Sequence, residues 1–583
     1  MAKQEQDAFI KNLPKIYGFY TGGFVGFVII LAILEQVGVP NRVIGYLFMF
    51  LTIAVYAIIG ILSRTIQVSQ YYVAGRQVPP VFNGMATGSD WMSGASFVGM
   101  AGSLYLLGYD GLAFVLGWTG GYVLVAVLLA PYLRKFGAYT VPDFLGARYG
   151  GNLARIIGII VLLSCSFTYV TAQIYATGII SSRFLDVPFE YAVFFGLAGI
   201  LVCSMLGGMR GVTWTQVAQY IILIVAYLVP VVILSAKNYG NPIPQLTYGS
   251  ALESITQLET AQGIEKLYVT PFTVYSPLNF FALIFCLMLG TASLPHILMR
   301  FFTTPSVKAA RASVGWALFF IFLLYFTAPA YAAFARLEIL ENVVGSTIGN
   351  MPAWVDNWGN IGLITITDAN GDGILQFSEF KINRDVVVLA LPEIAGLPYV
   401  VAGLVAAGGF AAALSTADGL LLAIANAISH DVYYKMINPN ADTKARLTFA
   451  RVILVVIALF AAWVASTKPS DILSMVAWAF SIAASGLFAP LVLGVWWKRT
   501  TTAGAIAGML LGYGVCMYYL VGTRYLGMDL WFGVNNISAG LFGIPVSFLA
   551  TYIFSLFSAA PSEEIQEMVE NVRVPIGEQL INE

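Results

Sequence analysis

The feature that most constrains the fold is a series of long apolar segments along the whole chain. A helix needs about 20 apolar residues to cross a bilayer, and backbone polar groups in lipid must be bonded within the protein. The segments lie at about 18–36, 43–63, 81–107, 112–131, 152–179, 190–207, 213–235, 277–298, 311–335, 395–430, 446–466, 471–497, 503–522 and 537–558. Since 59% of the residues are hydrophobic and only 10% are charged, the sequence predicts an all-α polytopic membrane protein with about 14 transmembrane helices.

The rest of the composition excludes several other classes of protein. The net charge is -1 and no basic tract is present, so nothing favours binding to nucleic acid. The N-terminus is polar for too long to be the charged region of a signal peptide, so the first apolar segment is expected to remain as a span. Scattered cysteines in apolar segments predict small core residues rather than disulfides or a zinc site; they are Cys165, Cys203, Cys286 and Cys516.

Basic residues indicate the orientation, because Lys and Arg accumulate in cytoplasmic loops. With the N-terminus inside, about two thirds of the 29 basic residues fall on the cytoplasmic side. We therefore expect a protein of the cell inner or plasma membrane with both termini, including the tail 561–583, in the cytoplasm. The long loops 236–276 and 336–394 would lie outside.

The third apolar segment carries polar residues at its centre. Asp90 lies among several serines and glycines of the sequence SDWMSGAS, and an acid near the bilayer centre costs at least a few kcal/mol unless it is paired or hydrated. We expect the helix to break near Asp90–Gly94 and to free backbone groups that hold an ion or an anion. The alternative is an unbroken glycine-rich helix whose serines bond to the preceding turn.

Two later segments also carry polar residues. Ser415 and Thr416 place adjacent hydroxyls in the middle of the tenth span, and together with freed carbonyls they suit a weakly held alkali cation; alternatively, they bond to their own helix. Gly290 and Pro295 interrupt the eighth span. His296 beside this proline could handle protons, but it is expected to pack or bond locally, and Arg300 is expected to anchor the inner membrane interface.

The interrupted third and eighth spans are five helices apart, which predicts two inverted halves, at 81–235 and 277–497. This arrangement is typical of alternating-access secondary transporters, and no Walker motif suggests coupling to ATP. Residues 1–80 would add a tail and two peripheral spans, and residues 498–560 two C-terminal spans.

The second long loop contains a pattern that matches an EF-hand loop at every specified position. Its expected calcium ligands are Asp368, Asn370, Asp372, the carbonyl of Ile374, Gln376 and Glu379. Flanking helices are not evident, so we expect a structural calcium clip rather than a sensor. The alternative is an acidic turn that matches the pattern by chance.

Four motifs together support a resemblance to a known family. They are SDWMSGASFVGMAG (89–102), GGMRGVTWTQVAQ (207–219), LPHILMRFFT (294–303) and AAALSTADG (411–419). The chain resembles the sodium:solute symporter family over nearly its whole length, which implies a LeuT-like five-plus-five inverted repeat with additional helices. The extra first span and the EF-hand-like loop are closest to the acetate/monocarboxylate permease branch.

The resemblance implies a sodium site formed by the carbonyls of Ser89, Met92 and Ala412 and the hydroxyls of Ser415 and Thr416. Many family members carry a TDxxQ pattern in the seventh span, where this chain has Thr215, Gln216 and Gln219. The missing carboxylate puts a second sodium in doubt and makes proton coupling more plausible. Sodium and protons therefore remain alternative coupling ions.

The substrate expected is a small carboxylate held at the start of the half-helix near Gly94, where the helix dipole is positive. Candidate binding residues are Ser93, Gly94, Ser96, Gln173 and Thr291, and Tyr169 of the fifth span is a candidate for lining the cavity or packing. No arginine is predicted deep enough to clamp the carboxylate.

We expect a symporter that imports acetate or a related monocarboxylate with sodium or protons, embedded in lipid and of undetermined oligomeric state. A symporter of the same fold for proline, a sugar or urea is an alternative, as is a transporter-like ligand sensor. The spans contain no cluster of His, Cys or carboxylate residues with catalytic spacing, so an enzyme is not expected.

Overall fold

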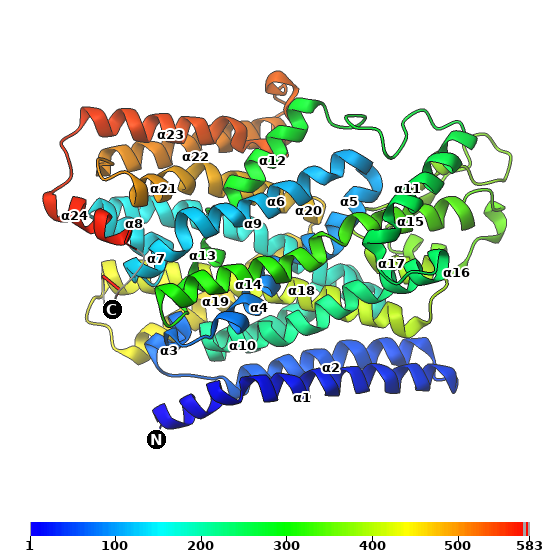
Figure 1. Ribbon diagram of the computed structural model, residues 1–583, viewed down its shortest axis with the longest axis horizontal. Helices are drawn as coiled ribbons and strands as arrows, with labels where there is room; N and C mark the ends of the chain where they lie inside the picture. Colours follow the sequence, from blue (N-terminus) through cyan, green and yellow to red (C-terminus); the bar gives the residue numbers. More distant parts are fainter. Residues whose placement is uncertain (1, 575–578, 581–583) are drawn as a thin grey trace.

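The computed structural model describes residues 2–574 and 579–580, and most of them form helices that run roughly parallel to one another (Figure 1). The first twelve are α1 (Ala2–Gln36), α2 (Asn41–Leu62), α3 (Val68–Val73), α4 (Pro80–Trp91), α5 (Met100–Leu107), α6 (Leu112–Leu124), α7 (Ala130–Phe136), α8 (Val141–Tyr149), α9 (Asn152–Leu185), α10 (Phe189–Tyr239), α11 (Pro244–Ala261) and α12 (Pro277–Thr291). The others are α13 (Pro295–Phe302), α14 (Val307–Tyr325), α15 (Ala328–Asn342), α16 (Ala353–Gly359), α17 (Val387–Ile394), α18 (Tyr399–Asn426), α19 (Thr443–Ser466), α20 (Ile472–Ala483), α21 (Ala489–Trp496), α22 (Thr502–Tyr525), α23 (Gly540–Phe557) and α24 (Glu563–Val572). Strands β1 (Ile364–Ile366) and β2 (Phe380–Ile382) form a two-stranded antiparallel sheet.

Local sequence signals determine where many of these helices begin. At several N-termini a Ser, Thr or Asp side chain accepts a hydrogen bond from a backbone N–H of the first turn, and such a cap typically contributes about 1 kcal/mol. The capping residues include Thr140, Ser276, Asp442, Asp471, Thr501 and Ser562. The cap at Ser562 begins α24, which follows Pro561.

In the described part of the chain, twelve helices are long and apolar enough to cross a membrane, and a shorter apolar helix covers Phe189–Leu201. The expected count of 14 is not confirmed, because two pairs of expected segments merge. The third and fourth join through a tight turn at Gly108, and the sixth and seventh both belong to α10, which is interrupted at Gly208. Gly208 has φ +54, and a Cβ there would lie 2.5 Å from the ring of Tyr71. Only glycine allows the chain to turn so tightly at this point.

Two helices are interrupted at the predicted places, which confirms both expectations. The chain leaves the helical conformation after α4, at Met92, and resumes as the π-helical segment η2 (Ala95–Gly99) followed by α5. The eighth expected span is divided into α12 and α13, with Pro295 at the first position of α13. Proline is favoured there because its missing N–H is not needed at a helix start.

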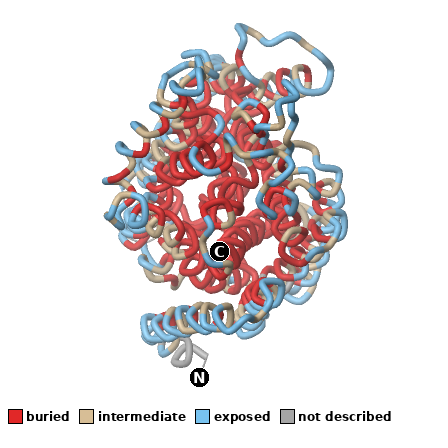
Figure 2. The backbone as a smooth tube through the Cα atoms, turned by 90° about the vertical axis from the view of Figure 1, so that its right-hand side faces the viewer, coloured by how far each residue is buried: buried red, intermediate tan, exposed pale blue. Residues whose placement is uncertain are grey.

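Helix α18 lies at the centre of the molecule. Every residue from Val400 to Asn426 is buried, and the helix packs against α9 and α10. Helices α1 and α2 lie together outside this bundle, with much of their surface exposed (Figures 1 and 2). The last turn of α1 nevertheless contacts the core, because the Glu35 carboxylate accepts hydrogen bonds from the backbone N–H groups of Tyr399 and Val400 at 2.7 and 2.8 Å.

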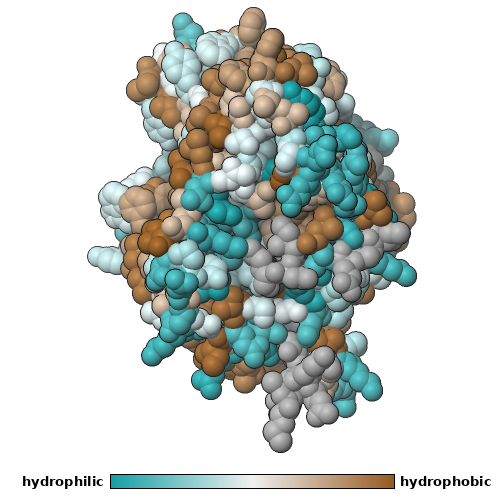
Figure 3. All heavy atoms as spheres, turned by 90° about the vertical axis from the view of Figure 1, so that its left-hand side faces the viewer, coloured by the Kyte–Doolittle hydropathy of each residue, from teal (hydrophilic) through white to brown (hydrophobic). Residues whose placement is uncertain are grey.

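The two ends of the molecule differ in structure. The beginning of α1 and helix α24 lie at one end, and α11 and α15 to α17 gather at the other (Figure 1). The first of these ends carries many hydrophilic side chains (Figure 3). Three of the cysteines, Cys165, Cys286 and Cys516, are buried and free as expected, and the side chain of Cys203 lies outside those described.

Candidate functional site

The interrupted helix α4 and the central helix α18 meet through oxygen atoms. The Ser415 hydroxyl donates to the carbonyl of Ser89 at 2.7 Å and lies 2.9 Å from the carbonyl of Ala412. The Thr416 hydroxyl lies 2.7 Å from the carbonyl of Asp90 and 3.3 Å from that of Ala412. These hydroxyls therefore bridge two helices that are 326 residues apart in the chain, besides contacting their own helix. We call these five residues the oxygen cluster.

The oxygen cluster includes four of the five residues expected to bind sodium. The fifth, Met92, is at the helix break, but the carbonyl in contact with Thr416 belongs to Asp90. A third helix holds the cluster in place, because the Gln216 side-chain amide donates to the carbonyl of Ser415 at 2.7 Å. Uncharged hydroxyl and carbonyl oxygens are hard donors that suit an alkali cation, whereas the softer transition metals prefer nitrogen and sulfur ligands.

Arg300 lies in the core, which corrects the expectation that it anchors the membrane interface. Its side chain is fully buried, and its Nε lies 2.9 Å from Oδ2 of the equally buried Asp90. A second nitrogen of the guanidinium donates to the Thr213 hydroxyl at 3.2 Å. The sequence expectation was wrong because α13 begins only after the break, which carries Arg300 inward to the acid of α4. An arginine is therefore present deep in the bundle, but its charge is already paired with the Asp90 carboxylate.

A further buried carboxylate lies on α18 within one turn of the oxygen cluster. It belongs to Asp418. It forms a hydrogen bond with the Ser204 hydroxyl of α10. Gly419 packs directly against the Asp90 carboxylate, since a Cβ there would lie 2.3 Å from its Oδ1.

Four aromatic rings gather beside the break in α4, and we call them the aromatic cage: Trp91, Trp118, Tyr169 and Phe480. The ring of Phe480 lies at their centre, with centroid distances of 5.7 Å to Trp91, 5.8 Å to Trp118 and 5.8 Å to Tyr169. The cage brings together α4, α6, α9 and α20. Sequence reasoning proposed Tyr169 but missed the other three rings, because an aromatic residue within an apolar span gives no periodic signal that separates lining from packing.

The expected substrate-binding residues lie around this cage with different partners. The backbone N–H of Gly94 donates to Gln173 Oε1 at 2.7 Å, and the Ser96 hydroxyl lies 2.8 Å from that of Tyr325. Ser93 is within 3.4 Å of the backbone N–H of Ser96. Thr291 donates to the carbonyl of Leu287 in its own helix, so its hydroxyl is already engaged.

Several buried polar atoms near the cage make no hydrogen bond to the described residues. They are Trp118 Nε1, the Tyr122 hydroxyl, Gln173 Nε2 and both ring nitrogens of His296. His296 packs its ring against Tyr169, with centroids 5.5 Å apart, so the expected local packing is present without a local hydrogen bond. Buried donors normally have partners, in the protein or in ordered water, so the unpaired donors around the cage are candidates for holding an acceptor such as an anion.

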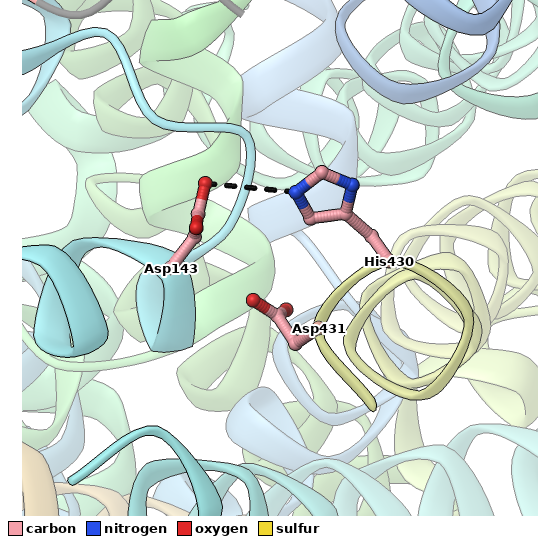
Figure 4. A group of neighbouring side chains, drawn as sticks. All are labelled: Asp143, His430 and Asp431. Carbon is pink, nitrogen blue, oxygen red and sulfur yellow. Dashed lines mark ion pairs between the residues drawn. The ribbon is translucent and has the colours of Figure 1, made fainter. Parts of the chain in front are cut away.

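A second polar cluster lies near the end of the molecule that carries α8 and α24 (Figure 1), and Figure 4 shows its side chains. It joins Asp143 of α8 to His430 and Asp431, which belong to the π-helical segment η7 (Ala427–Ile437) after α18. Arg155 lies 3.2 Å from Asp143 and 3.6 Å from Asp431. The guanidinium thus supplies the positive charge that a metal ion would otherwise provide, and we interpret the cluster as an ion-pair network that joins α8, α9 and η7.

The charge state of Asp143 follows from its neighbours. Burial opposes its ionisation, but the hydrogen bond and charge of His430, together with the charges of Lys435 and Arg155, lower the pKa of Asp143 to about 2. The Asp143 carboxylate is therefore negative at neutral pH and holds this end of the bundle together.

The EF-hand-like loop closes around its own acidic side chains. The Asp368 carboxylate accepts from the backbone N–H groups of Gly371 and Gly373 at 2.8 and 3.1 Å. Glu379, at the last position, accepts from Ala369 at 2.7 Å and from Gln376 at 3.0 Å. The remaining predicted ligands also lie in this turn, where the Asp372 carboxylate accepts from Asn370 and Gln376 side chains and from the N–H of Ile374. The sheet of β1 and β2 flanks the loop in place of two EF-hand helices.

The protein is a multi-pass helical bundle, and two interrupted helices meet a buried polar site at its centre. These features define the class of secondary membrane transporters. These proteins move a small molecule across the membrane and are not enzymes. Comparison with known proteins agrees with this class and specifies it further.

The model of the sodium:solute symporter family matches residues 71–352 and 377–512, and the chain belongs to this family. It is 44% identical over 679 aligned residues to the uncharacterized symporter H16_A2524 of Cupriavidus necator, with 98% of this chain and 99% of the relative covered. It is 26% identical to the monocarboxylic acid transporter of Corynebacterium glutamicum, over 90% of this chain and 93% of that protein.

A solved structure shares the fold at low sequence identity. It is a Na⁺-coupled sialic acid symporter in a substrate-bound outward-open state, which matches 89% of this chain and 99% of its own with a TM-score of 0.68 and 18% identity. The fold is therefore the LeuT-like inverted repeat expected from the motifs, and the protein is a symporter embedded in the membrane with sodium as the ion that its family couples to transport.

Proposed function

We propose that this symporter imports acetate or a closely related small monocarboxylate together with sodium. The observation that carries the proposal is the group of unpaired buried donors beside the aromatic cage, on Trp118, Tyr122, Gln173 and His296. A carboxylate accepts hydrogen bonds from such donors, and charge-assisted hydrogen bonds are the stronger ones. The similarity to a monocarboxylic acid transporter supports the same substrate class.

The electrostatics of the site favour a small anion over a larger polar solute. Arg300 is neutralised by Asp90, so the substrate carboxylate is held by N–H and O–H dipoles rather than by a free positive charge. The surrounding rings of the aromatic cage offer an apolar wall for a short alkyl group. A sugar would require many more paired hydroxyl partners than these rings supply.

Sodium would be held by the oxygen cluster, with Met92 as a further carbonyl donor. The Ser415 and Thr416 hydroxyls would turn their lone pairs toward the cation, and the carbonyls of Ser89, Asp90 and Ala412 would complete the shell. Bound sodium would join α4 to α18 and fix the break from which Gly94 faces the substrate. Movement of the halves 81–235 and 277–497 relative to each other would then expose both sites to the cytoplasm. In this proposal both termini also lie in the cytoplasm.

The test is uptake of labelled acetate into proteoliposomes under an imposed sodium gradient, with a proton gradient as a second arm. Trp118→Phe keeps an aromatic side chain but replaces the indole by a smaller phenyl ring without the N–H donor. The loss of a hydrogen bond to a charged group, about 1.5–3 kcal/mol, should raise KM for acetate about tenfold or more. Trp316→Phe, on the exposed surface of α14, is the matched control and should leave KM unchanged.

The outcomes separate the alternatives. Absence of acetate uptake under either gradient would reject the substrate class, and uptake of labelled proline, urea or a sugar would then identify another member of the same fold. Binding of a ligand without any transport would instead favour the sensor. Uptake driven by protons alone, with no effect of sodium, would reject the coupling ion proposed here.

We also propose that the EF-hand-like loop binds one calcium ion as a structural clip. The Asp368, Asp372 and Glu379 carboxylates face one turn, and Gly373 at φ +73 permits the sharp bend that such loops require.

In the purified symporter, millimolar calcium should raise the melting temperature, and Glu379→Gln should abolish the rise because it removes the bidentate ligand. Asp356→Asn, in α16 of the same outer region, is the control and should keep the response. A melting temperature that does not depend on calcium in the unmodified protein would reduce the loop to a hydrogen-bonded turn.

A further inference from the structure

Phe480 contacts all three of the other rings in the aromatic cage, and neighbouring helices hold its backbone in place. Its ring contacts Trp91, Trp118 and Tyr169 at once. Behind it, Gly290 of α12 packs so closely that a Cβ at that glycine would lie 2.7 Å from both Cβ and the carbonyl oxygen of Phe480. The backbone of Phe480 therefore cannot withdraw from the cage.

The next residue holds the same segment from another side. The Ser481 hydroxyl donates to the carbonyl of Ile537 at 2.9 Å, which ties α20 to the chain before α23. Phe480 is only 1% exposed, and close packing of this kind transmits a change in side-chain volume directly to whatever lies beside it.

The positions of the unpaired donors suggest how a bound carboxylic acid would be oriented relative to the Phe480 ring. Gln173 lies at the break in α4 through its bond with Gly94, and the ring of His296 meets that of Tyr169 edge to face. A carboxylate held by these donors would leave its alkyl chain among the rings, where Phe480 forms the shared wall. The other rings of the cage carry an N–H or O–H group, whereas Phe480 is wholly apolar.

We propose that Phe480 determines the longest alkyl chain that the symporter accepts. With the phenyl ring in place, the methyl or ethyl group of a two- or three-carbon acid would lie against Phe480, and a longer chain would meet the ring. Removing the ring opens a cavity that an aliphatic chain fills favourably, because each buried CH₂ group is removed from water. This inference rests on the proposed function, since it concerns the substrate bound at that site.

The experiment compares uptake and mutual competition of acetate, propionate, butyrate and hexanoate in proteoliposomes for the unmodified protein, Phe480→Leu and Phe480→Ala. The ratio of kcat/KM for butyrate to that for acetate should rise about tenfold or more in Phe480→Ala, and Phe480→Leu should lie between. A structural role alone would lower uptake of all four acids in parallel and leave the ratio unchanged.

Phe488→Ala is the matched control. Phe488 is a buried phenylalanine just beyond α20, whose ring packs on Phe548 with centroids 5.7 Å apart and away from the cage. It should lose similar stability without any change of the ratio. If Phe480→Ala does not fold, Phe480→Leu alone decides the matter by the same ratio.

Two failures remain distinguishable. If the unmodified protein transports none of the four acids, the proposed substrate class is rejected. If it transports acetate and the chain-length profile is the same in both Phe480 variants, the assignment of Phe480 is overturned while the proposed function stands.

Discussion

Replacing Arg300 by methionine should destabilise the protein by about 3–5 kcal/mol, the usual effect of breaking a buried ion pair. The reason is that the Asp90 carboxylate would remain fully buried without its partner 2.9 Å away. Because the carbonyl of the same Asp90 contacts Thr416 in the oxygen cluster, sodium-driven uptake should also be lost. The measurements are the melting temperature of the purified protein and uptake in proteoliposomes.

Two controls separate charge from size in this experiment. The double variant Asp90→Asn with Arg300→Met removes both charges and should recover most of the lost stability, since it leaves no buried charge unpaired. Arg42→Met removes one partner of an exposed pair, in which the side chains of Arg42 and Asp186 are 63% and 77% exposed, and should leave the melting temperature almost unchanged. A single Arg300 variant as stable as the unmodified protein would contradict the pairing.

Replacing both Ser415 and Thr416 by alanine should abolish the effect of sodium. The change removes both hydroxyl oxygens proposed to hold the cation and leaves the four carbonyls of Ser89, Asp90, Met92 and Ala412, too few to replace its hydration shell. The apparent affinity for sodium should fall by at least about tenfold, which corresponds to about 1.4 kcal/mol. Sodium-dependent shifts in melting temperature measure this directly, without reference to any substrate.

The matched control is Thr551→Ala in α23. The Thr551 hydroxyl is buried like that of Thr416 but donates to the carbonyl of Ser547 in its own helix. This variant should keep the full response to sodium. An unchanged sodium dependence in the Ser415 and Thr416 double variant would remove the oxygen cluster from the mechanism.

The sequence predicted the features that follow from local chemistry. Hydrophobic length identified the spans, and the polar residues between Ser89 and Ser96 identified the break in α4, because both depend on what lipid tolerates at a given position. Adjacent hydroxyls at Ser415 and Thr416 indicated oxygen donors for the same reason. The family motifs then indicated that these distant segments meet, which the contacts between α4 and α18 confirm.

Features that depend on three-dimensional packing were not predictable in this way. Arg300 was assigned to the interface because its position was counted along one continuous span, and the break in that span moves it to Asp90. The aromatic cage draws single residues from four helices, and no local pattern distinguishes Trp118 or Phe480 from the many other aromatic residues in the spans. The expected helix count differed for a related reason, since glycine turns at Gly108 and Gly208 replace the loops that normally separate spans.

The contact between Glu35 and the first turn of α18 has a consequence for motion within the membrane. A carboxylate that satisfies two N–H groups at a positive helix terminus stabilises the attachment of that terminus, so α18 and the outer pair α1 and α2 should form one stationary frame. The helix break at Met92 directly follows α4, which contacts α18 at the oxygen cluster. We therefore expect α4 to swing against a fixed α18 in each cycle, and a disulfide between α1 and α18 should leave transport intact.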